Sequence, residues 1–153
     1  MTTSETTSSP VSVTAAILVI GDEILSGRTK DKNIGYIAEY LTNIGIELRE
    51  VRIVPDVEGE IVAALNALRH RYTYVFTTGG IGPTHDDITA DAIGKAFGRK
   101  VVHDEKAMRI MGSMYAERGM EFNEARMRMA RMPEGSIHID NPVSAAPGFN
   151  VEN

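Results

Sequence analysis

The chain of 153 residues contains no cysteine and no tryptophan. Without cysteine there can be no disulfide bond and no thiolate metal site, and this composition suits the cytoplasm. No apolar run reaches the roughly 18 residues that a membrane-spanning helix needs. The net charge is −5, whereas binders of nucleic acid or of anionic membranes usually present a basic surface. We therefore expect a cytoplasmic protein with no nucleic-acid and no membrane partner.

The composition otherwise predicts one ordinary globular domain. Hydrophobic residues make up 42% of the chain and charged residues 24%, which are values close to globular averages. Residues 1–14 are polar and rich in serine and threonine, which predicts a disordered tail before a domain over 15–153. Most of the eight methionines lie between Met108 and Met132, where we interpret them as adaptable core residues.

Short apolar runs alternate with segments of helical periodicity. The predicted strands are 15–20, 46–54, 74–76, a short edge strand at 101–102, and 136–139; the predicted helices have their apolar stripes within 34–41, 61–68, 88–97 and 107–114, with a less regular helix over 123–131. This alternation predicts a three-layer α/β/α sandwich with a mostly parallel central sheet. Ligands bind such sheets outside the carboxyl ends of the strands, so the loops that follow Ile20 and Phe76 should meet at one site.

The loop after the third predicted strand is rich in glycine and reads Thr77-Thr78-Gly79-Gly80-Ile81-Gly82-Pro83-Thr84-His85-Asp86-Asp87. Glycines let a ligand approach the backbone closely, and a helix N-terminus attracts phosphate. The loop matches neither a P-loop nor the dinucleotide fingerprint. Two interpretations stay open for its acids. Thr84 to Asp87 fits a capping box, which would make the acids structural; alternatively, Asp86 and Asp87 bind Mg²⁺ beside a phosphate.

The loop after the first strand, Gly21-Asp22-Glu23-Ile24-Leu25-Ser26-Gly27-Arg28, adds an acid pair, a hydroxyl and a cation. Asp31 or Asn33 suits the cap of the following helix. Asp56 follows the second strand at the same sheet edge, where a simple turn residue is an equally good interpretation. His85 is the one histidine in the candidate site, and we interpret it as a solvated loop residue.

Two motifs of the sequence resemble those of a known family. The segments Ile20 to Gly27 and Thr77 to Thr89, about fifty residues apart, are similar to those of the molybdopterin-binding domain family (the MoCF, MoaB and MogA-like proteins). The nearest branch by these motifs is the N-terminal domain of competence/damage-inducible protein A (CinA)-like proteins. The resemblance extends over about 15–149, through Asn123, Arg131-Met132-Pro133-Glu134-Gly135 and Asn141-Pro142. Ser144 stands where the family usually has glycine. Relatives commonly continue beyond this chain with another strand and helix, so we expect a truncated domain.

The resemblance implies a phosphorylated pterin, molybdopterin, as the ligand, and a link to molybdenum cofactor biosynthesis. Some family members adenylylate that phosphate with ATP and Mg²⁺, and their important acids fall on Asp56 and Asp87 here. The CinA-like branch implies a different activity, a divalent-metal-dependent ADP-ribose pyrophosphatase. A non-catalytic oligomerisation or regulatory domain is the third alternative, so whether the chain is an enzyme stays open. Relatives form trimers or dimers, which implies a homo-oligomer.

These inferences give a defined set of candidate residues. Asp56 and Asp87 are the candidate catalytic residues, and Asp86 and Asp87 are the candidate metal ligands. The glycines and Thr84 of the second loop would hold the phosphate, while residues near the C-terminus would close the pterin side. The predicted ligand-binding residues are Gly21, Asp22, Glu23, Ser26, Thr78, Gly79, Gly80, Gly82, Thr84, Ser144, Pro147 and Gly148.

Overall fold

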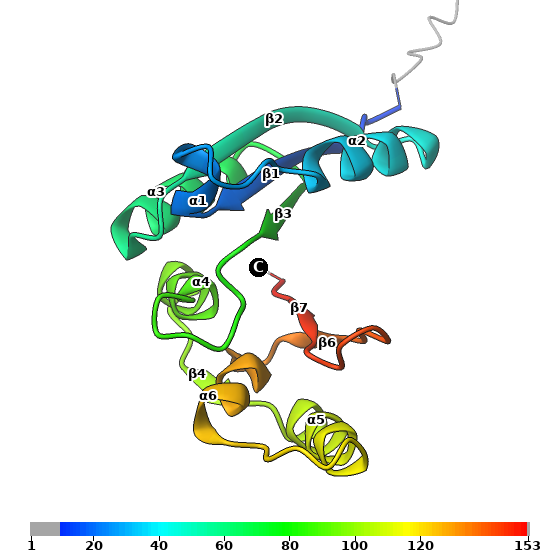
Figure 1. Cartoon of the computed structure of the whole chain (residues 1–153). Coiled ribbons are helices and arrows are strands. Elements are labelled where there is room, and N and C mark those ends of the chain that lie inside the picture. The colour runs from blue at the N-terminus through cyan, green and yellow to red at the C-terminus, as the bar shows by residue number, and fades with distance from the viewer. Residues whose placement is uncertain (1–9, 153) are drawn as a thin grey trace, which may run out of the picture.

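The computed structural model of the chain describes residues 10–152 (Figure 1). The predicted disordered tail therefore lies largely outside the described residues. Residues 10–13 form neither helix nor strand, and the first strand begins at Thr14, one residue before the predicted domain boundary. Over the described range, no helix has the length and apolarity that crossing a membrane would require.

The centre of the fold is a parallel sheet of three strands. Strand β1 (Thr14–Ile20) lies between β2 (Glu47–Val54) and β3 (Tyr74–Thr78). Residues 15–20 of β1 are all buried, as their continuous apolar run predicted, because a central strand with both faces covered has no exposed side. All three strands run in the same direction, so their carboxyl ends lie at one edge.

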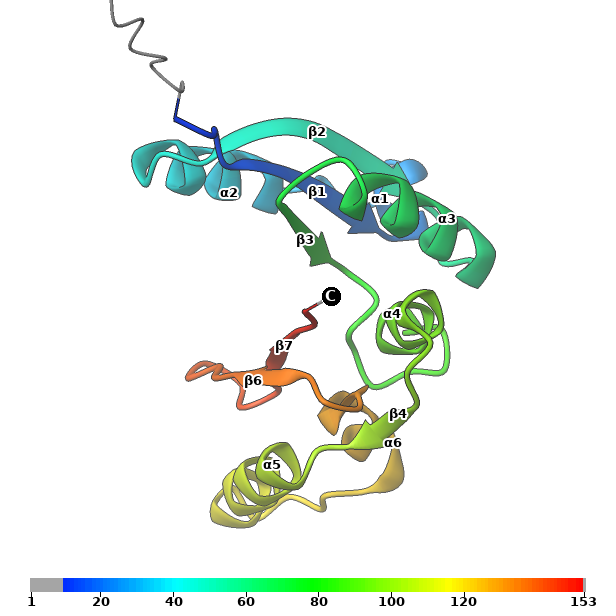
Figure 2. The same ribbon diagram turned by 180° about the vertical axis from the view of Figure 1, so that it is seen from behind.

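Helices cover both faces of this sheet. The connection after β1 contains a short helix, α1 (Asp22–Leu25), which the sequence did not predict, and then α2 (Asn33–Asn43). Helix α3 (Glu58–Arg69) follows β2. Figures 1 and 2 show α2 and α3 on opposite faces of the sheet. The predicted α/β sandwich around a mostly parallel sheet is therefore confirmed, and α4 (Thr89–Phe97) packs beside α3.

The second half of the chain departs from the predicted alternation. It consists of β4 (Val101–His103), α5 (Glu105–Glu117), α6 (Glu124–Met127), the 3₁₀ turn η1 (Arg128–Ala130), β5 (Arg131–Pro133), β6 (Ile137–Ile139) and β7 (Gly148–Asn150). Strands β4 and β5 form one antiparallel pair, and β6 and β7 form another. None of these four joins the central sheet, so the expected sandwich sheet is smaller than the pattern suggested.

The predicted helix over 123–131 is wrong at its C-terminal end. Asn123 caps α6, its side-chain oxygen accepting from the Arg126 amide at 3.0 Å. The helix then tightens into η1, and Arg131 enters a strand because its backbone pairs with His103 of β4. A long-range pairing of this kind overrides the local preference for helix. Strand β7 was not predicted, since three residues carry too little periodicity.

Side-chain hydrogen bonds fix the start of two other helices, and one of them comes from Asp31, which the sequence offered as a cap. Asp104 accepts from the amide of Ala107 at 2.9 Å and thereby begins α5. Asp31 accepts from the amide of Ile34 at 2.7 Å at the start of α2. Each carboxylate satisfies an amide that has no partner inside its helix, and it lies where the helix dipole favours negative charge.

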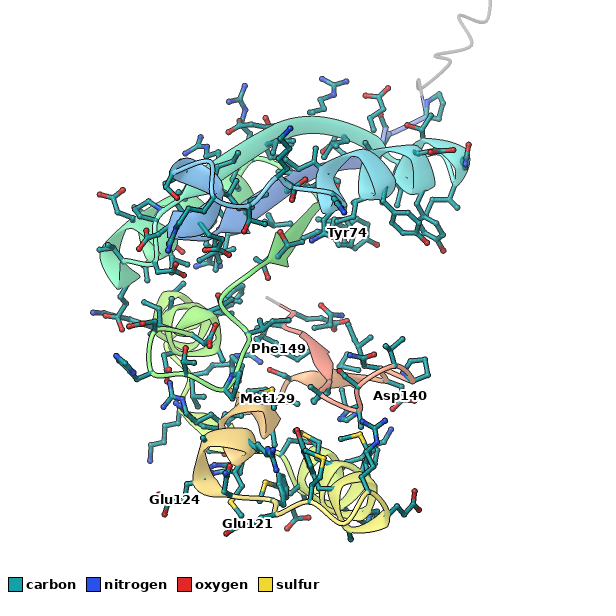
Figure 3. The ribbon with its side chains drawn as sticks, in the orientation of Figure 1. Tyr74, Glu121, Glu124, Met129, Asp140 and Phe149 are labelled. Atoms are coloured by element: carbon teal, nitrogen blue, oxygen red, sulfur yellow. The ribbon has the colours of Figure 1, made fainter. Side chains whose placement is uncertain are left out.

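The buried side chains form two clusters. The first joins β1 to α3 and α4 and includes Leu18 and Leu68. The second consists of Ala107, Met111, Ala130 and Met132. Phe149 of β7 packs against both clusters, and Figure 3 shows it between the sheet and the lower helices. Met111 and Met132 are buried and Met108 and Met129 pack against them, which confirms the core interpretation for these four, whereas Met120 is exposed.

The loop between β6 and β7 contains a strained residue. Ala145 has a φ of 59°, and it is the one non-glycine residue with positive φ among residues 10–152. Ser144, where glycine was expected, has no positive φ; its hydroxyl accepts from the Asn141 side-chain amide at 2.9 Å. The conformation that favours glycine therefore occurs at position 145, next to Ser144, the position at which the family usually has glycine.

Ala145→Gly should stabilise the protein. Relieving the left-handed strain, less the entropy cost of a glycine, is worth about 0.5–1 kcal/mol, or a rise in Tm of about 1–4 °C for a domain of this size. Thermal unfolding followed by circular dichroism measures it. Ala146→Gly is the matched control and should lower Tm, since Ala146 packs in the same place without positive φ. An unchanged or lower Tm for Ala145→Gly would contradict this interpretation.

Candidate functional site

The carboxyl ends of β1 and β2 are joined by a reciprocal pair of hydrogen bonds. The amide of Asp22 donates to the Asp56 carboxylate at 3.0 Å, and the amide of Asp56 donates to the Asp22 carboxylate at 3.2 Å. The amide of Gly21 donates to the carbonyl of Val54 at 3.0 Å and extends the strand pairing by one step. The two acids therefore fix the turn of α1 against the end of β2.

A cavity of about 370 Å³ lies at this edge of the sheet. Residues from three separate segments line it, and both suspected loops contribute, as the topology predicted. The lining residues are Asp22, Glu23, Arg28, Asp56, Gly80, Thr84, Asp86 and Asp87. A volume of this size lies within the range of small-ligand sites.

The glycine loop lies directly on the end of β1. Gly79 has a φ of +90°, and a Cβ at this position would overlap the carbonyl oxygen of Ile20. Gly80 has a φ of +65°, and its Cβ would overlap the hydroxyl of Thr89. That hydroxyl, which is almost fully buried, donates to the carbonyl of Gly79 at 2.8 Å. Glycine is therefore required at both positions by the fold itself, before any ligand is considered.

Asp87 closes the second part of the loop. Its Oδ2 atom accepts from the Thr84 amide at 2.9 Å and from the Thr84 hydroxyl at 2.7 Å. The capping box, one of the two interpretations left open for this loop, does not form, because α4 begins at Thr89, five residues after Thr84. The reason is that Asp87 folds back on Thr84 and forms a closed turn before the helix starts. The acid thus serves the loop and also lines the cavity.

The electrostatic setting of Asp87 favours its ionised form. Partial burial raises the pKa of the Asp87 carboxyl, but hydrogen bonds from the Thr84 hydroxyl and from the amides of Thr84 and Gly82 outweigh this effect. The positive charge of Arg128 adds to them, and the pKa of Asp87 lies below its ordinary value. Asp87 is therefore a carboxylate at neutral pH.

The cavity is strongly acidic. Five carboxylates line it, and Arg28 is the one cation among its lining residues. The Arg28 Nε atom donates to the hydroxyl of Ser26 at 3.2 Å, and this hydroxyl donates to the carbonyl of Glu23 at 3.4 Å. His85 is largely exposed and contacts Asp86 at 3.2 Å, which agrees with its interpretation as a solvated loop residue. A bare phosphate entering here would be repelled unless a cation accompanied it.

The donor atoms suit a hard divalent ion, since carboxylate and hydroxyl oxygens are the ligands that Mg²⁺ prefers. Within residues 10–152, however, no three acidic or histidine side chains converge closely enough to hold an ion by themselves. Mg²⁺ is commonly held by one or two carboxylates, with the remaining positions filled by phosphate oxygens and water. The residues present fit a metal that binds together with a phosphate, and they do not fit a protein-only metal site.

The remaining predicted ligand residues lie around the cavity or away from it. Thr78 is the last residue of β3, and Gly79 and Gly82 shape the loop without lining the cavity. Gly21 and Ser26 belong to the turn around α1. Ser144, Pro147 and Gly148 belong to the β6–β7 hairpin and are not among the lining residues (Figure 1). A part for these three in closing the site therefore stays a prediction.

Two arginines at or near the cavity were not among the predicted site residues. Arg28 lines it from the first loop, where its charge was visible in the sequence. Arg128 reaches the carbonyl of Asp87 through its Nη2 atom at 3.4 Å. Asp87 and Arg128 are 41 positions apart in the sequence, and Arg128 stands in a methionine-rich segment, so no local pattern identified it.

The chain matches a known family over nearly its whole length. The sequence model described as "Probable molybdopterin binding domain" matches residues 16–153. The CinA-like protein of Syntrophotalea carbinolica is 36% identical over 141 residues, which cover 92% of this chain and 34% of that protein. The chain spans about half the length of other curated relatives it matches, 53% and 52% in two of them.

Solved structures agree with the fold and the family. The crystal structure of CinA from Thermoplasma acidophilum, described as a protein of unknown function, has a TM-score of 0.81 and 32% identity, over 90% of this chain and 80% of that one. The tungsten cofactor synthesizing protein MoaB from Pyrococcus furiosus has a TM-score of 0.54 and 28% identity, over 72% and 68% of the two chains.

Gly79→Ala should be severely destabilising. The added Cβ meets rigid backbone at Ile20 and occupies a strained φ, so we expect a loss of about 3 kcal/mol or more in the free energy of unfolding. Gly98→Ala is the matched control, because Gly98 has a φ of +65° with nothing within 4 Å of its Cβ position; it should cost about 1 kcal/mol. Urea unfolding of both variants measures the difference, and equal losses would contradict the close contact.

Asp87 should also contribute to stability in a pH-dependent way. Because its pKa is lower in the folded than in the unfolded protein, its contribution is fully present above the unfolded value of about 3.9 and is lost as pH falls through the folded value. Asp87→Asn should reduce the loss of stability below about pH 4. Urea unfolding between pH 3 and 7 measures this slope, with the exposed Asp86→Asn as control. Equal slopes in the wild type and Asp87→Asn would rule out this role.

Proposed function

Because the chain belongs to the family of probable molybdopterin-binding domains, with CinA-like relatives, we propose that it binds molybdopterin in the acidic cavity at the carboxyl ends of β1 and β3. The observation that carries the proposal is the meeting of the glycine loop and the acidic first loop around one cavity of about 370 Å³.

The phosphate end binds at the glycine loop. Gly80 and Thr84 line the cavity, and Gly79 and Gly82 let the backbone pass close to the ligand. The Thr84 hydroxyl donates to Asp87, and it is the side chain best placed to turn toward a phosphate oxygen. Ser144, Pro147 and Gly148 then close the pterin side from the β6–β7 hairpin.

Asp86 and Asp87 are the residues that would hold Mg²⁺ beside the phosphate. When bound, the ion would neutralise charge between the phosphate oxygens and the carboxylates of Asp86 and Asp87. Without it, five carboxylates against one guanidinium would oppose an anionic ligand. We therefore expect ligand affinity to depend steeply on Mg²⁺. Asp56 and Asp22 hold the adjoining turn in place by their mutual backbone bonds.

A link to molybdenum cofactor biosynthesis follows from the same proposal. The similar structure from Pyrococcus furiosus is described as a tungsten cofactor synthesizing protein, and the similarity covers 72% of this chain. We also expect a homo-oligomer, a trimer or a dimer, which sedimentation measures directly. An assembly with no ligand affinity would favour a non-catalytic oligomerisation or regulatory domain.

The acidity of the cavity favours a second candidate function, hydrolysis of the pyrophosphate of ADP-ribose. In this reaction a water oxygen attacks one phosphorus, the bridging P–O bond breaks, and AMP and ribose 5-phosphate leave. The water's proton passes to a carboxylate, for which Asp87 and Asp56 are the candidates. Asp86 and Asp87 would hold the metal that stabilises the charge on the phosphoryl oxygens.

One pair of assays distinguishes the two functions. Calorimetry with molybdopterin and Mg²⁺ should give micromolar binding that is lost without Mg²⁺ and weakened at least tenfold in Asp87→Asn. AMP release from ADP-ribose with Mg²⁺, Mn²⁺ or Co²⁺ is measured beside it, with Glu117→Gln as the control variant, because Glu117 is an exposed acid at the end of α5 that does not line the cavity. Metal-dependent release that Asp87→Asn abolishes would favour the pyrophosphatase, and no molybdopterin binding would contradict the first proposal.

A further inference from the structure

Two arginines from the second half of the fold hold the beginning of α4. Arg131 of β5 forms an ion pair with Asp91 in the first turn of the helix, and both side chains are partly buried. Arg128 of η1 lies three residues earlier and donates through Nη2 to the carbonyl of Asp87. The contacted residues, Asp87 and Asp91, are four positions apart, and they lie on either side of Thr89, where α4 begins.

Arg128 is unusual among the residues that the structure describes. Its Nε atom is buried and has no hydrogen-bond partner there. A buried donor without an acceptor is unfavourable, and such groups are rare in folded proteins. The position therefore does not serve stability alone. Its guanidinium lies near Asp87, and its positive charge favours the ionised form of this carboxylate, which lines the cavity.

We propose that Arg128 is a positioning residue of the ligand cavity, which holds Asp87 and the closed turn from Thr84 in the arrangement that receives the ligand. Its effect on ligand binding rests on the proposed function, whereas its effect on the turn does not. Arg128 itself does not line the cavity, and it acts through Asp87.

The contacts define how this control works. Asp87 is fixed at two points, its carbonyl by Arg128 and its Oδ2 atom by the amide and hydroxyl of Thr84. Loss of the first contact frees the peptide of Asp87 to rotate, and the Thr84 amide then loses its acceptor. Arg131 remains on Asp91 and keeps α4 attached to β5, so the change is confined to the turn.

Amide hydrogen exchange measured by NMR tests the proposal on the whole chain. The Thr84 amide is protected by Asp87 in the wild type, and Arg128→Met should speed its exchange about tenfold or more. Arg128→Lys, which keeps the charge and one donor, should restore most of the protection. Arg126→Met is the matched control from the adjoining helix, because Arg126 lies over Tyr115, 4.7 Å from its ring centroid, and donates to Glu121, away from the loop; it should lower Tm without changing exchange at Thr84.

Ligand titrations on the same samples complete the test, with molybdopterin and with ADP-ribose, each in Mg²⁺. Arg128→Met should weaken binding about tenfold, as loss of a residue that orients a ligand group commonly does, and Arg128→Lys should recover it. Unchanged exchange at Thr84 in Arg128→Met would overturn the proposal. Faster exchange together with no binding of either probe by the wild type would uphold Arg128 as the positioning residue of the turn and would instead count against the proposed function.

Discussion

The site depends on the close approach of the Gly79 backbone to the carbonyl of Ile20. No side chain fits between these two segments, so the loop after β3 lies against the end of β1 and brings its acids to the first loop. The buried Thr89 fixes this arrangement from the other side by donating to the Gly79 carbonyl. Because β1 is buried along residues 15–20, the contact is made at the end of the central, fully covered strand.

The acids of the cavity serve both structure and binding. Asp22 and Asp56 each accept one backbone amide from the other's segment, and Asp87 accepts both donors of Thr84 on a single oxygen atom. A carboxylate has two oxygens and about four acceptor positions, so each of these acids keeps acceptor capacity for a ligand or an ion. The two readings of the acids that the sequence left open, structural and ligand-binding, are therefore compatible in the same side chains.

The first half of the chain was predictable because its signals are local. A continuous apolar run predicted β1, and parallel strand order placed the two loops at one edge, where the cavity lies. The second half depends on distant contacts. Arg131 is in a strand because β4 lies beside it, Thr84 fails to cap α4 because Asp87 folds back on it, and Arg128 reaches the loop from far along the chain. Neither spacing nor composition records such contacts, although the family resemblance supplied the candidate acids.

In the proposed function, the ligand binds where the glycine loop meets the first loop. Amide chemical shifts recorded while molybdopterin is added in the presence of Mg²⁺ locate the binding site residue by residue. We expect the largest changes at Gly80, Thr84 and Asp22, which line the cavity from the two loops, with smaller changes at the β6–β7 hairpin. Changes confined to that hairpin, or to the distant face of α5, would contradict the proposed site.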